Sequence, residues 1–329
     1  MATRRSPRRA RASDTVRIAT RGSELALRQA RLVLDALTRR GIGAELVPMK
    51  TMGDKKLDEP LGAIGAKGLF TEELERALLA GKVDCCVHSL KDLPTEMPGG
   101  LTVVAVLERE DPRDVLVVND AIPADGLSDL PRGSRVGTSS LRRRAQLLGA
   151  RPDVDVVELR GNVPTRLKKV DEGKVHAAIL AAAGLRRLGV QQRIDAWLEP
   201  PGWLPAAGQG AIAVQARADD ERMSALLSPL DHDGTRAAVR AERSFLAALD
   251  GGCQVPIGAL VMESVTGLVL HGLIADARGT RIIRGEEPVD AANPERAAHR
   301  LATELLRRGG DQILSQLRNL EKVPAPQPE

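Results

Sequence analysis

The sequence predicts an α/β protein with two sheet-and-helix units and a small α+β unit at its C-terminal end. Two observations support this prediction. Buried-type strands alternate with amphipathic helices in two successive blocks, and short alternating strands follow near the C-terminus. Such alternation predicts mainly parallel sheets with helices on both faces. At 329 residues the chain has room for two or three domains, and two α/β units would form a cleft between them.

The first block begins with a strand and a helix. Residues 16–20 form an apolar run typical of a buried strand. Residues 23–40 have helical periodicity, with Ser23 as the predicted N-cap and Gly41 just past the end. We expect further elements in this block: strands at 45–50, 83–87 and 101–107, and a helix at 71–80. Residues 51–68 are rich in glycine and charge without periodicity, which predicts a functional or mobile loop that is weakly ordered without substrate.

A second block repeats this pattern. It contains predicted strands at 115–118, 134–136, 154–159 and 175–180, and helices near 141–148 and 163–170. Residues 200–205 include three prolines and interrupt the alternation, and a strand at 211–215 is expected to return to the first block. The α+β unit is predicted from a helix at 233–249, strands at 257–262, 268–275 and 281–285 around a turn at 276–279, and a covering helix at 294–308.

The predicted domain boundaries follow these blocks. We expect a first domain at 14–109 and 208–228, a second at 110–207 and a third at 229–322, with a disordered basic leader at 1–13 and a disordered tail at 323–329. The net charge is +4, but the leader contains five arginines and no acid, so the remaining chain is almost neutral. Such an arm can bind nucleic acid or a membrane, but because it lacks an apolar run a solvated leader is favoured.

Composition argues against several classes of function. Tyr is absent and only two Trp and two Phe occur, which argues against a stacking platform for single-stranded nucleic acid. No apolar stretch is long enough to span a membrane. Three cysteines with two adjacent make no disulfide framework, so we expect a reducing, cytoplasmic compartment. The five histidines lack metalloprotease spacing, and we expect no metal site.

The cysteines differ in their surroundings. Cys85 and Cys86 lie in a strand-like run and are interpreted as small buried hydrophobic residues, and His88 at the strand end is interpreted as a packing residue. Cys253 lies in a loop beside Gly251 and Gly252, whose missing side chains let a ligand approach the sulfur. The pattern alone leaves a functional thiol and a packed thiol equally open.

Basic residues gather where predicted strands and loops end, positions that line clefts in open α/β sheets. They are Arg21, Lys67, Lys91, Arg142, Arg143, Arg160 and Arg166. The helix beginning near Ser139 adds unpaired N–H groups and a positive dipole end, so a polyanionic ligand is predicted. Successive helical residues point about 100° apart, so Arg142, Arg143 and Arg144 cannot all face one cleft, and Arg144 is expected to face solvent.

Several motifs, in their order along the chain, resemble those of the porphobilinogen deaminase family, the hydroxymethylbilane synthases. They are RIATR from Arg17, GAKGLF from Gly65, HSLKD from His88, EDPRD from Glu110, GTSSLRR from Gly137, LRGN from Leu159 and GGCQVP from Gly251. The resemblance runs from about residue 16 to residue 308. It implies an α/β fold with two periplasmic-binding-protein-like α/β domains around a cleft plus a small C-terminal α+β domain.

The resemblance also implies an activity. Members of the family are transferases of tetrapyrrole, porphyrin and heme biosynthesis. They join four porphobilinogen molecules head to tail, release four ammonia molecules and form the linear hydroxymethylbilane. Cys253 matches the cysteine that holds the family's dipyrromethane cofactor through a thioether, and Asp92 matches the catalytic carboxylate. A fixed anion there would stabilise positive charge developing on the pyrrole ring, and acid–base catalysis is an equally natural role.

Further residues receive roles by matching position. The implied cofactor-binding residues are Cys253, Lys91, Arg142, Arg143, Ser140, Thr138 and Arg166. The implied substrate-binding residues are Arg21, Ser23, Lys67, Arg160, Arg187 and Gln209. Some relatives carry a lysine where Ala63 stands, so one cationic contact is expected to be missing here.

The resemblance further implies a monomer that passes its product to uroporphyrinogen-III synthase. A rival interpretation, from the fold alone, is a non-catalytic, anion-binding pair of solute-binding or effector-sensing domains. In such a protein Asp92 and Cys253 would be unnecessary.

Overall fold

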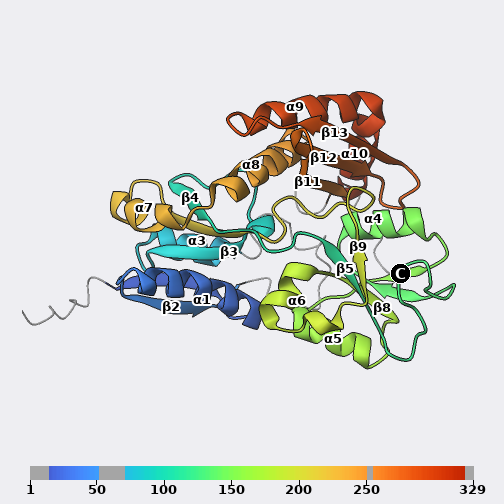
Figure 1. Ribbon diagram of the computed structural model, residues 1–329, viewed down its shortest axis with the longest axis horizontal. Helices are drawn as coiled ribbons and strands as arrows, with labels where there is room; N and C mark the ends of the chain where they lie inside the picture. Colours follow the sequence, from blue (N-terminus) through green and yellow to red (C-terminus); the bar gives the residue numbers. More distant parts are fainter. Residues whose placement is uncertain (1–14, 52–70, 250–254, 323–329) are drawn as a thin grey trace, which may run out of the picture.

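Three β-sheets organise the protein (Figure 1). The structure is a computed structural model that describes residues 15–51, 71–249 and 255–322. The strand order is β2-β1-β3-β10-β4 in the first sheet, β7-β6-β8-β5-β9 in the second and β11-β12-β13 in the third. The expected architecture of two α/β units and a small C-terminal α+β unit is confirmed.

The first sheet holds the N-terminal strands and one strand from much later in the chain. It comprises β1 (Val16–Arg21), β2 (Ala44–Met49), β3 (Cys85–Ser89), β4 (Leu101–Val106) and β10 (Ile212–Arg217), with helices α1 (Glu24–Arg39), α3 (Glu72–Leu79) and α7 (Glu221–Leu227). Ser23 caps α1 as predicted, since its hydroxyl accepts a hydrogen bond from the Ala26 N–H at 3.3 Å. Cys85 and Cys86 are wholly buried, which confirms them as core residues, and burial raises the pKa of the Cys85 thiol to about 12.

The second sheet is built the same way. It comprises β5 (Asp114–Val118), β6 (Arg135–Gly137), β7 (Asp155–Val157), β8 (Ala177–Ala181) and β9 (Ala196–Leu198), with helices α4 (Leu141–Ala150), α5 (Val163–Asp171) and α6 (Ala182–Leu188). The sequence did not predict α6, α7 or β9. The two helices have seven residues each, which is about two turns and too little periodicity for detection.

The prediction of mainly parallel sheets is wrong, because each α/β sheet is mixed. In the first sheet β1 runs parallel to β2 and β3, whereas β10 runs antiparallel to β3 and β4. In the second sheet β6 runs parallel to β7 and β8, whereas β5 runs antiparallel to β8 and β9. These two antiparallel strands are the first that the chain forms after it crosses between sheets: β5 is the first strand in the second sheet, and β10 is the strand with which the chain returns to the first sheet. No crossover helix of their own sheet precedes them to impose a parallel direction.

The C-terminal unit covers one face of a three-stranded sheet with helices. Its elements are α8 (Asp233–Ala248), β11 (Ile257–Ser264), β12 (Gly267–Ala275), β13 (Ile282–Pro288), α9 (Pro294–Leu305) and α10 (Asp311–Lys322). The α-helix α9 ends at Leu305, but helical backbone continues as a π-turn to residue 308, where the helix was predicted to end, and Gly309 with a φ of 104° interrupts it before the unpredicted α10. Within the described ranges, no helix is long and apolar enough to cross a membrane.

Candidate active site

A 3-10 turn, Leu90–Asp92 (η3), follows β3 directly and carries two of the predicted site residues. Leu90 is buried, and its N–H donates to the Ala211 carbonyl at 3.0 Å, which ties the turn to the chain entering β10. Lys91 and Asp92 therefore lie beyond the carboxyl end of a central strand, where ligands bind in α/β sheets.

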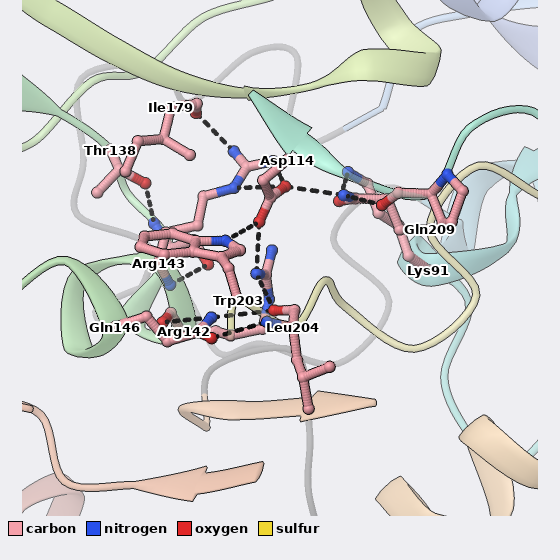
Figure 2. A network of polar contacts seen from close by, with 12 residues as sticks. Lys91, Asp114, Thr138, Arg142, Arg143, Gln146, Ile179, Trp203, Leu204 and Gln209 are labelled. Carbon is pink, nitrogen blue, oxygen red and sulfur yellow. Dashed lines mark hydrogen bonds and ion pairs between the residues drawn. The ribbon is translucent and has the colours of Figure 1, made fainter. Parts of the chain in front are cut away.

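Lys91 is connected to the second sheet through Gln209 (Figure 2). Lys91 Nζ donates to Gln209 Oε1 at 3.1 Å, and Gln209 Nε2 donates to Asp114 Oδ1 at 2.8 Å. Gln209 lies on the segment that returns to the first sheet, and Asp114 begins β5 after the segment that leaves it. The two segments that join the α/β units therefore meet in one polar network beside η3.

Asp114 is the centre of that network. Its Oδ2 accepts hydrogen bonds from Arg142 Nη1 at 2.6 Å and Trp203 Nε1 at 2.9 Å, and its Oδ1 accepts from Arg143 Nη2 at 2.7 Å (Figure 2). Burial alone would raise the pKa of this carboxyl, but Arg142 and Arg143 hold it well below its usual range. Sequence reasoning gave Asp114 no role. Its position could have indicated a role, because Asp114 is the last residue of the EDPRD motif and the first residue of a buried strand.

Arg142 and Arg143 are predicted ligand-binding residues, and both are buried and engaged by the protein itself. Besides binding Asp114, Arg142 donates to the Leu204 carbonyl and Arg143 to the Ile179 carbonyl, each at 2.8 Å. Arg144 is the most exposed of the three arginines, as expected, although it is only partly exposed. Its guanidinium donates to the Val156 carbonyl on β7 at 3.3 Å.

Thr138 and Ser140 form the N-terminus of α4, where an anion was predicted to bind. Thr138 Oγ1 accepts from the Ser140 N–H at 3.2 Å, and Ser140 Oγ accepts from the Arg143 N–H at 3.4 Å as the N-cap. The positive end of this helix therefore lies beside the arginine network.

Basic side chains surround Asp92 closely enough to affect one another's charge. Burial, and then the charge of Arg143, lower the pKa of Lys91 to about 8. Burial, and then the charges of Arg143 and Arg160, lower the pKa of Arg166 to about 10. The negative charge of Asp92 opposes both shifts. Arg160 Nη1 is buried and has no hydrogen-bond partner in the part of the chain that the structure describes. A buried donor beside mutually repelling cations is stabilised by a bound anion.

The remaining predicted residues are placed as follows. Arg187 Nη2 donates to the Gly210 carbonyl at 2.6 Å, next to Gln209, and burial lowers the pKa of Arg187 to about 10. Arg21 ends β1, and Ser23 caps α1. Lys67, Cys253 and Ala63 lie outside the described residues, as do most of loop 51–68, the leader 1–13 and the tail 323–329.

His88 is a buried packing residue, as predicted. Its Nε2 lies 3.1 Å from Gln215 Oε1, and burial, with a smaller contribution from Arg21, lowers its pKa to about 4. It is therefore neutral near pH 7.

Comparisons with known proteins show to which family this chain belongs. The family model "Porphobilinogen deaminase, dipyromethane cofactor binding domain" matches residues 16–225, and "Porphobilinogen deaminase, C-terminal domain" matches residues 236–307. The chain is 50% identical over 305 residues to a porphobilinogen deaminase of Xanthomonas euvesicatoria pv. vesicatoria, covering 92% of this chain and 99% of the relative. The corresponding Moorella thermoacetica protein is 49% identical, covering 92% and 96%.

A solved structure with a distantly related shape is the periplasmic VFT2 domain of Bordetella pertussis BvgS. Its TM-score is 0.40 at 17% identity, over 66% of this chain and 86% of that one. The family models, in contrast, span both α/β units and most of the C-terminal unit. The chain therefore belongs to the porphobilinogen deaminase family.

Proposed function

We propose that this enzyme joins four porphobilinogen molecules head to tail, releases four ammonia molecules and forms hydroxymethylbilane. Membership of the family makes it a transferase that polymerises porphobilinogen in tetrapyrrole biosynthesis with a dipyrromethane cofactor. The observation that supports the finer proposal is the position of Asp92, a carboxylate at the end of β3 among Lys91, Arg143, Arg160 and Arg166.

This arrangement separates two electrostatic tasks. The basic residues bind the carboxylate groups of the pyrrole rings, two on each ring. Asp92 stabilises the positive charge that develops on the ring of porphobilinogen as its amino group leaves as ammonia. A carboxylate oxygen of Asp92 also accepts a hydrogen bond from the pyrrole N–H and can take up its proton.

The described residues fit an anionic pyrrole cofactor. The unpartnered Nη1 of Arg160 and the lowered pKa values of Lys91 and Arg166 mark donors that a carboxylate would satisfy. When bound, dipyrromethane supplies the primer to which porphobilinogen units are added. We assign its binding to Lys91, Thr138, Ser140, Arg142, Arg143 and Arg166, and its attachment to Cys253. We assign the substrate to Arg21, Ser23, Lys67, Arg160, Arg187 and Gln209.

The role of Asp92 is tested by Asp92→Asn in protein that carries its cofactor. We expect the variant to fold and to retain the cofactor, and we expect turnover to fall by about 100-fold or more. Asp120→Asn, a change at an exposed acid, is the matched control and should leave turnover unchanged. Near-normal turnover of Asp92→Asn would remove Asp92 from the proposal.

The stoichiometry and the attachment site are tested separately. Ammonia and hydroxymethylbilane measured in one assay should be formed in a ratio of four to one. The intact mass of protein purified from cells should exceed the sequence mass by two pyrrole units, and Cys253→Ala should lack this addition. An unmodified Cys253 in active protein would contradict the attachment.

We also propose that the three domains correspond to residues 14–109 with 208–228, 110–207, and 229–322. The support is that the chain passes from the first sheet to the second between β4 and β5 and returns between β9 and β10. All strands of the second sheet lie between Asp114 and Leu198. A fragment of residues 110–207 should therefore show a cooperative melting transition, and a fragment without one would contradict these boundaries.

A further inference from the structure

The guanidinium group of Arg243 on α8 binds the backbone on both sides of Lys91 and Asp92. It donates to the carbonyls of Leu90 at 3.5 Å, Leu93 at 3.1 Å, Pro94 at 2.5 Å and Thr95 at 3.4 Å. One side chain from the C-terminal unit thus spans the segment that presents Asp92. A planar guanidinium can hold several carbonyls in one geometry, whereas a lysine ammonium cannot reproduce this fork.

The backbone around Asp92 has little support of its own. The turn η3 is three residues long, and residues 93–100 form neither helix nor strand before β4 begins at Leu101. Short 3-10 turns have poor hydrogen-bond geometry, and a single turn is not stable alone. The position of Asp92 must therefore be set by contacts from outside this segment.

Packing fills only part of the space between this segment and α8, because Leu90 and Leu93 are buried in one apolar cluster with Val239 of α8 but a pocket remains beside them. A cavity of about 200 Å³ lies there, lined by residues that include Leu90, Val106, Val239, Arg240 and Arg243. Side chains next to an empty space lose contacts on that side. The packing of Leu90 and Leu93 with Val239 and the hydrogen bonds of Arg243 therefore both set the distance between η3 and α8, and the hydrogen bonds act on the side where packing is missing.

The helix that carries Arg243 is firmly anchored. The adjacent residue, Glu242, is wholly buried and binds Arg109 through both carboxylate oxygens, at 2.6 and 3.0 Å. It also accepts from the Gly208 N–H at 2.7 Å and the Val261 N–H at 2.9 Å. Figure 1 shows α8 between β4 and the C-terminal sheet. Arg243 therefore acts from a helix that is fixed to both segments joining the α/β units.

We propose that Arg243 is a positioning residue that holds Asp92 at the geometry needed for catalysis. This inference rests on the proposed catalytic role of Asp92. Arg243 acts through the backbone of residues 90–95, to which it donates four hydrogen bonds. Its removal lets the turn move into the cavity, and small displacements of a catalytic group lower the rate of the chemical step more than they lower substrate binding.

The experiment compares Arg243→Ala, Arg243→Lys and Arg240→Ala as cofactor-loaded full-length enzymes. Arg240 lies one turn earlier on α8, lines the same cavity and binds Glu295 at 2.8 Å. It therefore controls for loss of a cation from this helix. For Arg243→Ala we expect kcat to fall roughly 10-fold to 100-fold while KM stays within about 2-fold of the wild-type value. We also expect faster hydrogen exchange at the Leu93 amide, whose N–H donates to the Leu90 carbonyl across η3. Arg243→Lys should fall between Arg243→Ala and wild type, and Arg240→Ala should match wild type.

Three outcomes would overturn the proposal. They are equal kcat values for the Arg243 variants and Arg240→Ala, unchanged exchange at the Leu93 amide, or a loss of activity that follows the unfolded fraction alone. If Arg243→Ala does not fold, kcat and exchange at the Leu93 amide are compared between Arg243→Lys and Arg240→Ala instead. Asp92→Asn separates this inference from the proposed function. Normal turnover of Asp92→Asn rejects the role of Asp92, whereas inactive Asp92→Asn with normal kcat in Arg243→Ala rejects only the role of Arg243.

Discussion

Glu242 and Arg109 form a buried ion pair in which both carboxylate oxygens bind the guanidinium, at 2.6 and 3.0 Å. Arg109 lies between β4 and β5, where the chain leaves the first sheet, and its Nε donates to the Gln209 carbonyl on the returning segment at 2.8 Å. The pair therefore joins the C-terminal unit to both segments that connect the α/β units.

Glu242→Ala should destabilise the whole protein. The change leaves the Arg109 charge and the Gly208 and Val261 N–H groups without their buried acceptor. Loss of one member of a buried pair costs about 3–5 kcal/mol of unfolding free energy, measurable by denaturant titration. Glu295→Ala, which removes a partly exposed partner of Arg240, should cost about 1 kcal/mol or less. Similar losses in the two variants would contradict this account.

Asp114→Asn should destabilise the protein in a pH-dependent way. Arg142 and Arg143 hold the pKa of Asp114 below its usual value, so its charge stabilises the folded state at every pH above the unfolded pKa of about 3.9. The difference in unfolding free energy between wild type and variant should be constant above about pH 5 and shrink as the pH falls further. Because Trp203 donates to Asp114, its fluorescence should also change. A difference that grew in acid would contradict the predicted sign.

Lys91 should make loading of the cofactor sensitive to mildly alkaline pH. Its pKa is lowered to about 8, chiefly by burial and then by Arg143. Above that pH the cofactor-free protein loses a cation assigned to the cofactor's carboxylates, so the rate at which it takes up dipyrromethane, followed by intact mass, should fall as the pH rises through about 8. In Lys91→Arg the fall should be absent below about pH 10, since arginine stays charged. Between pH 8 and 10 Lys91 holds its proton in the unfolded chain more fully than in the folded protein. The free energy of unfolding should therefore rise with pH in this range.

Gly210→Ala should disrupt the contact between the two connecting segments. Gly210 has a φ of 88°, and a Cβ built there would lie 2.2 Å from the Glu110 carbonyl oxygen. The substitution combines a left-handed backbone penalty of about 1–2 kcal/mol with a clash against backbone. Gly41→Ala is the matched control, because Gly41 has a φ of 74° but nothing within 4 Å of a built Cβ. The melting temperature should fall clearly further for Gly210→Ala, and equal falls would show that the close approach is unimportant.

The elements that could be predicted from the sequence are those set by neighbouring residues, such as a capping side chain followed by a periodic apolar face. The helix after Ser23 was predicted because a capping serine precedes a periodic apolar face, and the structure has both. The site at the ends of strands followed from the positions of Lys91, Arg142 and Arg160. The α4 N-terminus lies where the sequence placed it because Ser140 caps it.

Features set by distant residues could not be predicted in this way. Asp114 binds Arg142 and Arg143, which lie 28 and 29 residues further along, and Gln209, which lies 95 residues away. No periodicity indicates which acid meets which arginine. The antiparallel direction of β10 likewise depends on where the chain returns to the first sheet, and residues 211–215 contain no signal for direction.

The insertion of β10 between β3 and β4 has a consequence for how the protein forms during synthesis. When residues 15–106 have left the ribosome, β4 has no neighbour in its sheet, because β10 is more than 100 residues further along the chain. The second α/β unit has all its strands by residue 198, so it can complete itself first. The first α/β unit is thus made first and completed last, and a chain that stops before residue 212 leaves an open sheet edge available for aggregation.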